Sequence, residues 1–203
     1  LHQLTESKGA FATIVSGLAY GIDICAHKAA LESNLSTIGV LAHGFDRIYP
    51  QIHSNVAEQM KSHGGLLTEF MSETNPDREN FPKRNRIIAG LCDAILVIEA
   101  AKTGGALITA NIANSYNRDV FAIPGRIGDT FSEGCNTLIK TNRAAVFQSV
   151  KDLEYIMGWE REEVGSVATQ KQLFVELSQE EQKVYERLKE STKESLDNIS
   201  LNA

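Results

Sequence analysis

Short apolar, β-branched runs recur along most of this sequence, and segments that suit helices separate them. The runs are FATIVSG (11–17), STIGVLAHG (36–44), LLTEF (66–70), AILVIEA (94–100) and DVFAIPG (119–125), with a weaker AAVF at 144–147. The helix-compatible segments lie near 22–33, 53–63, 84–92, 105–117 and 135–141. Strands that are apolar on both faces are typical of a parallel sheet covered by helices. Because right-handed crossovers leave few topologies, the pattern predicts an α/β domain with a Rossmann-like, doubly wound, mostly parallel sheet.

The character of the sequence changes after residue 150. Residues 151–157 suit a short closing helix, and 158–177 mix Gly, Glu, Ser and Thr as a linker does. The stretch LSQEEQKVYERLKES (177–191) is amphipathic, and Ser178 and Glu181 have the spacing of a capping box. We therefore expect a Rossmann-like domain at 1–157, a linker at 158–177 and the start of a truncated helical domain at 178–203.

Charge is distributed unevenly along the 203 residues, which carry a net charge of −6. Residues 151–203 hold 12 acidic and 7 basic side chains, so most of the acidity lies in the tail. The balance argues against a protein coated with nucleic-acid-binding cations, but it is compatible with a local positive cleft in residues 1–150.

Cysteine spacing and hydropathy indicate the cellular compartment in which the protein is expected. Cys25, Cys92 and Cys135 lack CxxC spacing, so neither a disulfide framework nor a zinc site is predicted, and a reducing cytoplasm is the expected location. No apolar run approaches the roughly 18–20 residues that a membrane span needs, so no membrane association is expected. No signal peptide is recognised, and the start at Leu1 leaves an upstream export signal open.

Glycine-rich turns follow several of the expected strands. They are SGLAYGID (16–23), HGFDRIYP (43–50), KTGGALITA (102–110) and PGRIGD (124–129), and a fifth small-residue turn, FSEGCNTLI (131–139), opens a helix. Any one of these glycines could simply close a tight turn. In a parallel sheet, however, such turns share the carboxyl edge, where helix N-termini and bare amides bind anions. The set therefore favours an anion site.

The segment FPKRNRIIAGL (81–91) crowds three cations between an aromatic-proline corner and an apolar stretch. Pro82 predicts a helix that starts just after it, which places residues 83–86 in the first turn, where the helix dipole disfavours cations. We expect Ile87, Ile88 and Leu91 to form the buried face. A solvated basic face with an internal salt bridge is the alternative, but a phosphate-rich ligand accounts better for these cations.

No motif for catalysis, metal or cofactor binding is evident. The sequence has neither GxGxxG nor GxxxxGK[ST], so dinucleotide and P-loop chemistry lose their main support. Asp23 and His27 have an i, i+4 spacing that could serve a metal or an acid–base pair. Helix capping by Asp23 and an internal hydrogen bond of His27 are the favoured interpretation. Glu99 could hold a ribose hydroxyl, but turn capping is the commoner role. We predict no catalytic residue, no metal and no cofactor.

Seven segments, in this order, resemble the DNA-processing protein A family (DprA, also called Smf). They are SGLAYGIDICAHKAAL (16–31), TIGVLAHGFDRIYP (37–50), GGLLTEF (64–70), FPKRNRIIAGL (81–91), TGGALITANIA (103–113), RDVFAIPG (118–125) and SEGCNTLI (132–139). The resemblance implies a non-enzymatic, homodimeric Rossmann-like protein that binds and protects incoming single-stranded DNA and helps to load the recombinase RecA in natural transformation. It implies DNA contacts at Lys83, Arg84, Asn85, Arg86, Gly17, Gly44, Gly104 and Gly105. The helix at 178–191 resembles the start of the family's winged-helix-like domain.

The sequence departs from the family pattern in several places. The family's first strand ends in a GSR turn, and this sequence begins after it. The usual SGS turn is Thr103-Gly104-Gly105 here, which keeps backbone donors but loses hydroxyls. His53 stands where the family often has asparagine, and TNRAAV (141–146) replaces a common glycine-alanine pair.

Two other functional classes share features with this sequence. A nucleotide phosphoribohydrolase on a related Rossmann-like sheet would carry PGGxGTxxE, but TGGALITA has no glutamate at the matching position. A purely structural, partner-binding domain would show neither DNA binding nor turnover. Single-stranded DNA binding remains the main prediction, with Tyr49 or Phe81 as candidates for base stacking.

Overall fold

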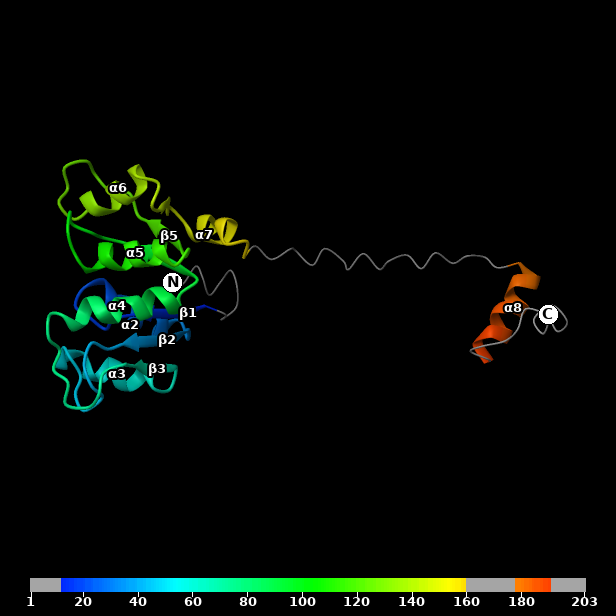
Figure 1. The fold of residues 1–203 in the computed structure, drawn as a ribbon, viewed down its shortest axis with the longest axis horizontal. Helices are drawn as coiled ribbons and strands as arrows, with labels where there is room; N and C mark the ends of the chain where they lie inside the picture. The colour runs from blue at the N-terminus through cyan, green and yellow to red at the C-terminus, as the bar shows by residue number, and fades with distance from the viewer. Residues whose placement is uncertain (1–11, 160–177, 191–203) are drawn as a thin grey trace. The chain divides into compact units, whose positions relative to one another are not determined.

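The computed structural model describes residues 12–159 and 178–190, which belong to two separate compact units. In the first unit strands and helices alternate along the chain (Figure 1). The elements are β1 (Thr13–Ser16), α2 (Ile22–Glu32), β2 (Ser36–Val40), η1 (Gln51–His53), α3 (Ser54–Met60), β3 (Gly64–Leu67), α4 (Asn80–Leu91), β4 (Ala94–Val97), α5 (Gly105–Ser115), β5 (Asp119–Ala122), α6 (Glu133–Lys140), β6 (Ala145–Val146) and α7 (Val150–Ile156). The predicted α/β class is confirmed.

All strand pairs within the described residues are parallel, as predicted. They form two ladders of three strands, in the orders β1-β2-β3 and β4-β5-β6. β2 and β3 step away from β1, while β5 and β6 step away from β4, which is the winding of a Rossmann-like sheet. The backbone ladder is divided in two, where the sequence predicted one sheet. The site described below lies where the winding reverses.

One hydrophobic core nevertheless joins the two halves. Val40 of β2 packs in the same buried cluster as Val97 of β4 and Val120 of β5, and Ile88 and Ala89 of α4 belong to it as well. Helix α4 thus contributes its inner face to a core shared by both ladders. The expected buried face was correct for Ile88, but it was wrong for Leu91, which is 50% exposed at the end of the helix.

Two boundaries differ from the prediction. β3 begins at Gly64 and ends at Leu67, so the predicted strand at 66–70 was placed too late. Helix α4 begins at Asn80 rather than after Pro82, so residues 83–86 follow the first turn instead of forming it. Proline is tolerated there because the first N–H groups of a helix have no intrahelical acceptor. The conflict between these cations and the helix dipole is therefore weaker than the sequence suggested.

The second unit contains α8 (Gln179–Glu190). The predicted capping box is present: the Ser178 N–H donates to Glu181 Oε2 at 2.8 Å, and the Glu181 N–H donates to Ser178 Oγ at 3.3 Å. Most of the predicted linker and residues 191–203 lie outside the described residues, so the winged-helix interpretation stays a prediction. None of the helices in the described ranges has the length and apolar composition that a bilayer crossing requires.

Candidate nucleic-acid interface

The connections that follow β1 to β5 gather at the carboxyl edge of the strands, on the left of the first unit in Figure 1. Helix α4 begins at this edge after the loop that follows β3, and α5 begins there after the loop that follows β4. The two helices pack against each other. The FPKRNR segment therefore meets the Thr103-Gly104-Gly105 turn at the position where ligands bind open α/β sheets.

The side chain of Arg84 lies against the ends of β1 and β2 and is only 4% exposed. Its Nη1 donates to the Gly17 carbonyl oxygen at 2.8 Å and also to the Val40 carbonyl oxygen, and its Nε donates to Asn85 Oδ1 at 3.2 Å. The guanidinium carbon lies 5.9 Å from the centre of the Phe81 ring. Burial lowers the pKa of Arg84, and the nearby Asp23 carboxylate opposes this shift. Arg84 thus fastens α4 to the ends of β1 and β2.

Both backbone polar groups of Gly17 are hydrogen-bonded, the N–H to Asp23 and the carbonyl oxygen to Arg84. A Cβ atom at this position would overlap the guanidinium of Arg84, so the close approach of Arg84 requires glycine. The N–H groups of Gly17 and Ala19 both donate to Asp23 Oδ2, at 3.0 and 3.3 Å. Leu18 between them has a φ of 59°, the left-handed conformation that turns successive amides toward one anion. The carboxylate of Asp23 is the anion that these two amides bind. The predicted capping of α2 by Asp23 was therefore wrong, because Asp23 accepts hydrogen bonds from the turn after β1.

Gly44 is also packed within the protein. Its N–H donates to the Thr74 carbonyl oxygen at 3.2 Å. A Cβ here would overlap the Met71 carbonyl oxygen and lie 2.7 Å from Ser72 Cα. The structure therefore gives Gly17 and Gly44 packing roles with occupied amides, and a DNA contact at either stays a prediction.

Gly104 and Gly105 are exposed at the start of α5. Gly104 has a φ of 156°, which favours glycine, and no side chain caps the first turn of this helix in the described residues. Asn85, which is 7% exposed, donates from Nδ2 to the Gly105 carbonyl oxygen at 3.4 Å. The first turn of α5 is thus an open helix end, which Asn85 ties to α4; open helix ends of this kind favour anions.

Exposed cations lie on α4 and in the loop that precedes α5. Lys83 and Arg86 are exposed and three residues apart, so they share one face of α4. Arg86 pairs with Glu69, with 52% and 32% of the two side chains exposed, whereas Lys83 has no ion pair within the described residues. Lys102, which sequence reasoning missed, is exposed just before the Thr103-Gly104-Gly105 turn. Its position directly before the glycine turn could have marked it as a candidate phosphate contact.

His27 is buried and takes no part in this interface. The Thr37 hydroxyl donates to the Ile14 carbonyl oxygen at 3.0 Å, so it accepts from His27 Nδ1–H at 2.7 Å, which confirms the expected internal hydrogen bond. Nε2 is buried without a hydrogen-bond partner among the described residues. Burial lowers the pKa of His27 from 6.5 to about 4; Asp23 opposes this shift, and His53 and Arg84 reinforce it.

This lowered pKa predicts acid-sensitive stability. Above pH 6.5 both states are neutral at His27, but below it the unfolded chain takes up a proton that the folded chain does not, until the pH nears the folded pKa of about 4. The free energy of unfolding is expected to fall by about 2 kcal/mol from this group between pH 8 and pH 5. Urea unfolding at both pH values should show a smaller loss for His27→Gln and an unchanged loss for the exposed His63→Gln. Equal losses in all three proteins would exclude His27 as the cause.

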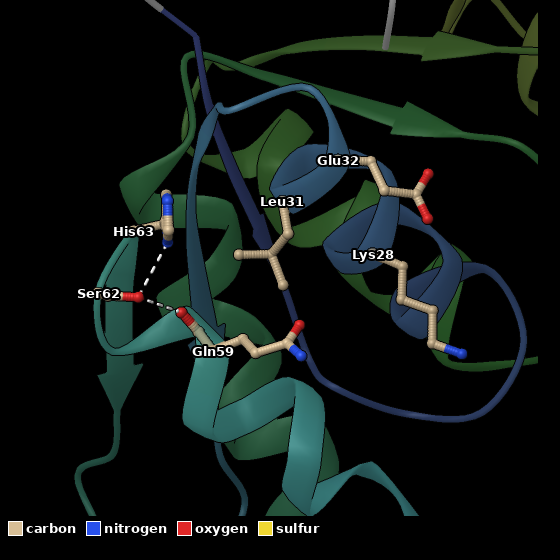
Figure 2. A pocket seen from close by; sticks show the side chains of 6 residues that line it. All are labelled: Lys28, Leu31, Glu32, Gln59, Ser62 and His63. Carbon is tan, nitrogen blue, oxygen red and sulfur yellow. Dashed lines mark hydrogen bonds between the residues drawn. The ribbon is translucent and has the colours of Figure 1, made fainter.

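A hollow lies at the opposite edge of the strands, between the ends of α2 and α3. It has a volume of about 350 Å³ and is lined by Lys28, Leu31, Glu32, Gln59, Ser62 and His63 (Figure 2). The Ser62 hydroxyl donates to the Gln59 carbonyl oxygen at 2.9 Å, so the 2.9 Å contact between Ser62 Oγ and His63 Nδ1 uses a proton from histidine. Ser62 is thus not set up as an activated nucleophile.

An open helix end at the carboxyl edge of parallel strands is the position at which proteins of the Rossmann-like class bind anionic ligands. The family model of DNA recombination-mediator protein A matches residues 2–157, and the chain belongs to that family. The resemblance read from the sequence motifs is confirmed.

Individual relatives agree with this assignment. The chain is 48% identical over 146 residues to Protein Smf of Synechocystis sp., covering 72% of this chain and 36% of that protein. It is similar to the X-ray structure of DprA from Streptococcus pneumoniae, with a TM-score of 0.68, 40% identity, and coverage of 76% of this chain and 54% of that one. A structure of DprA from Helicobacter pylori, described by its single-stranded DNA binding mode, has a TM-score of 0.69 and 28% identity, and the match covers 78% and 71% of the two chains. The chain spans little more than a third of the Synechocystis relative.

Proposed function

We propose that this protein binds single-stranded DNA at the carboxyl edge of its strands, where α4 meets α5. The observation that carries the proposal is the open first turn of α5 at Gly104 and Gly105, tied through Asn85 to the helix that bears Lys83 and Arg86. Phosphates suit both the free amides and the exposed cations. Membership of a DNA recombination-mediator family supports the same ligand, as does the DNA binding mode described for the H. pylori relative.

The eight residues predicted to contact DNA divide into two groups in this proposal. Lys83, Arg86, Gly104 and Gly105 are exposed and contact phosphates directly. Arg84, Asn85, Gly17 and Gly44 are buried and hold the loops on which the exposed residues stand. Opening the ion pair with Glu69 would release Arg86 for a phosphate, and surface pairs of this kind cost little to open.

Lys83→Ala tests the proposal by its salt dependence. With two to four phosphates neutralised, the slope of log affinity against log salt is expected to be about −1.5 to −3, at roughly −0.7 per phosphate of a single strand. The variant should lose about 0.7 of that slope and bind roughly fivefold more weakly at 0.1 M salt. Fluorescence anisotropy with labelled oligo-dT over a salt series measures both quantities.

The matched control is Lys28→Ala, an exposed lysine on α2 that lines the hollow at the opposite edge (Figure 2). It should leave the slope and the affinity unchanged. A slope that stays the same in Lys83→Ala would remove Lys83 from the interface, and no retention of oligo-dT by the parent protein would refute the proposed function.

The remaining activities in the proposal rest on the family. We propose that the protein acts in the cytoplasm as a homodimer, shields incoming DNA during natural transformation and helps to load RecA, without chemical turnover. A binding role is supported because Asp23 and His27, the two side chains considered for catalysis, both form hydrogen bonds within the fold. Light scattering tests the homodimer, nuclease protection tests the shielding of DNA, and RecA filament assays test the loading of RecA.

A further inference from the structure

Six large apolar side chains are exposed in the loops that follow β1, β2 and β3 and at the adjoining start of α2. Their exposed fractions run from 38% for Ile22 to 85% for Met71. We call this set the apolar edge: Tyr20, Ile22, Phe45, Tyr49, Ile52 and Met71. Because each of these loops leaves the carboxyl end of a strand, the six side chains belong to one end of the ladder β1-β2-β3. Large apolar side chains that are exposed together at one end of a sheet favour a binding surface there.

Hydrogen bonds between the loops hold the apolar edge in place. His53 Nδ1 donates to the Leu18 carbonyl oxygen at 2.8 Å, which joins the loop after β2 to the loop after β1. The Glu73 N–H donates to Asp46 Oδ1 at 2.7 Å, which joins the loop after β3 to the loop after β2. The surface is thus preorganised, which lowers the entropic cost of binding.

Two tyrosine rings in this surface are each supported by a second ring. Tyr20 meets His53 edge to face, with ring centres 5.1 Å apart and planes at 67°. Tyr49 lies 6.2 Å from Phe81, with planes at 56°. Both tyrosines remain open to solvent, Tyr20 at 68% and Tyr49 at 47%. Supported but exposed aromatic rings are platforms for flat, apolar ligands.

Phe81 links the apolar edge to the cations of α4, and this link indicates which ligand fits. Phe81 lies two residues before Lys83 in α4, so the Tyr49 platform adjoins the helix whose cations face phosphates in the proposed function. A ligand that carries phosphates along one side and flat rings along the other fits both surfaces, and single-stranded nucleic acid has this arrangement. An apolar protein partner would match the rings but not the adjoining cations.

We propose that Tyr49 and Tyr20 stack nucleobases of the single-stranded DNA whose phosphates lie against α4 and α5, which rests on the proposed function. Base faces are free in a single strand and stacked inside a duplex, so the apolar edge selects single strands over duplex DNA. Stacking on an aromatic ring tolerates every base, and the site therefore has little sequence preference.

The test separates stacking from phosphate binding by using two probes on the full chain. One is labelled oligo-dT, and the other is an abasic oligomer of the same length, which keeps the phosphates and lacks the bases. Tyr20→Ala and Tyr49→Ala are each expected to weaken oligo-dT binding by about tenfold and to leave abasic binding unchanged. Tyr20→Phe keeps the ring and should bind oligo-dT as the parent does. Tyr155→Ala, on α7 and 74% exposed, is the matched control and should change neither affinity.

Several results would overturn the inference. Unchanged oligo-dT affinity in both alanine variants, while the parent protein binds, would remove stacking and leave the proposed function standing. Equal weakening on both probes would show that the tyrosines act only through loop geometry. A change of sedimentation coefficient without a change in DNA affinity would make the apolar edge a contact between copies of the chain. Failure of the parent to bind either probe would end the proposed function and this inference together.

Discussion

Replacing Arg84 with alanine is expected to lower the free energy of unfolding by about 3–5 kcal/mol, because a buried guanidinium and its three hydrogen bonds are lost. The Gly17 and Val40 carbonyl oxygens would each lose a charge-assisted donor, and Asn85 would lose a partner. The space beside Gly17 would also become a cavity, since the guanidinium lies directly on that glycine. Urea denaturation followed by circular dichroism measures the change.

Arg86→Ala is the matched control for Arg84→Ala, because it removes the same side chain two positions along the same helix. Arg86 is half-exposed and its ion pair with Glu69 is on the surface, so a loss below about 1 kcal/mol is expected. For DNA binding the order is reversed. Arg86→Ala is expected to lower the affinity directly, whereas Arg84→Ala is expected to affect binding only by destabilising the fold. A loss for Arg84→Ala as small as that for Arg86→Ala would mean that Arg84 does not fasten α4 to β1 and β2.

Gly44→Ala is the second substitution with a large expected effect, a loss of about 2–4 kcal/mol in the free energy of unfolding. The added methyl group would overlap the Met71 carbonyl oxygen and crowd Ser72 Cα, and both are backbone atoms that cannot rotate away. Moving that loop aside would also break the hydrogen bond from the Gly44 N–H to the Thr74 carbonyl oxygen. Thermal and urea unfolding at neutral pH test this expectation.

A control for Gly44→Ala must add a methyl group at a glycine with room for it. Gly90 lies within α4, and a Cβ there would meet only the Tyr116 ring at an ordinary 3.8 Å. Gly90→Ala is expected to raise the free energy of unfolding by about 0.5–1 kcal/mol, because alanine favours helix. If Gly44→Ala were equally well tolerated, the loop at Met71 would not be packed against Gly44 as described.

Local pattern in the sequence was sufficient for the class of fold and for singling out the segments that meet at the candidate site. Alternating apolar runs and helix-compatible segments predicted parallel strands and their order along the chain. Ser178 and Glu181 predicted a capping box that the structure contains. The FPKRNR segment and the Thr103-Gly104-Gly105 turn were each singled out, and the structure joins them through Asn85 and Gly105. These features depend on residues close together in the chain, so local physical chemistry was enough to find them.

Only the tertiary structure decided which of the clustered cations face outward. Arg84 and Arg86 look alike in the sequence, yet Arg84 is buried on carbonyl oxygens that lie 67 and 44 residues away in the chain, and Arg86 is exposed beside Glu69. The same holds for the glycines, because Gly44 is packed by the loop at Met71 while Gly104 is open. A guanidinium turns inward only where distant backbone supplies acceptors to replace its water. That supply is a property of how the strands and loops meet, and no local pattern specifies it.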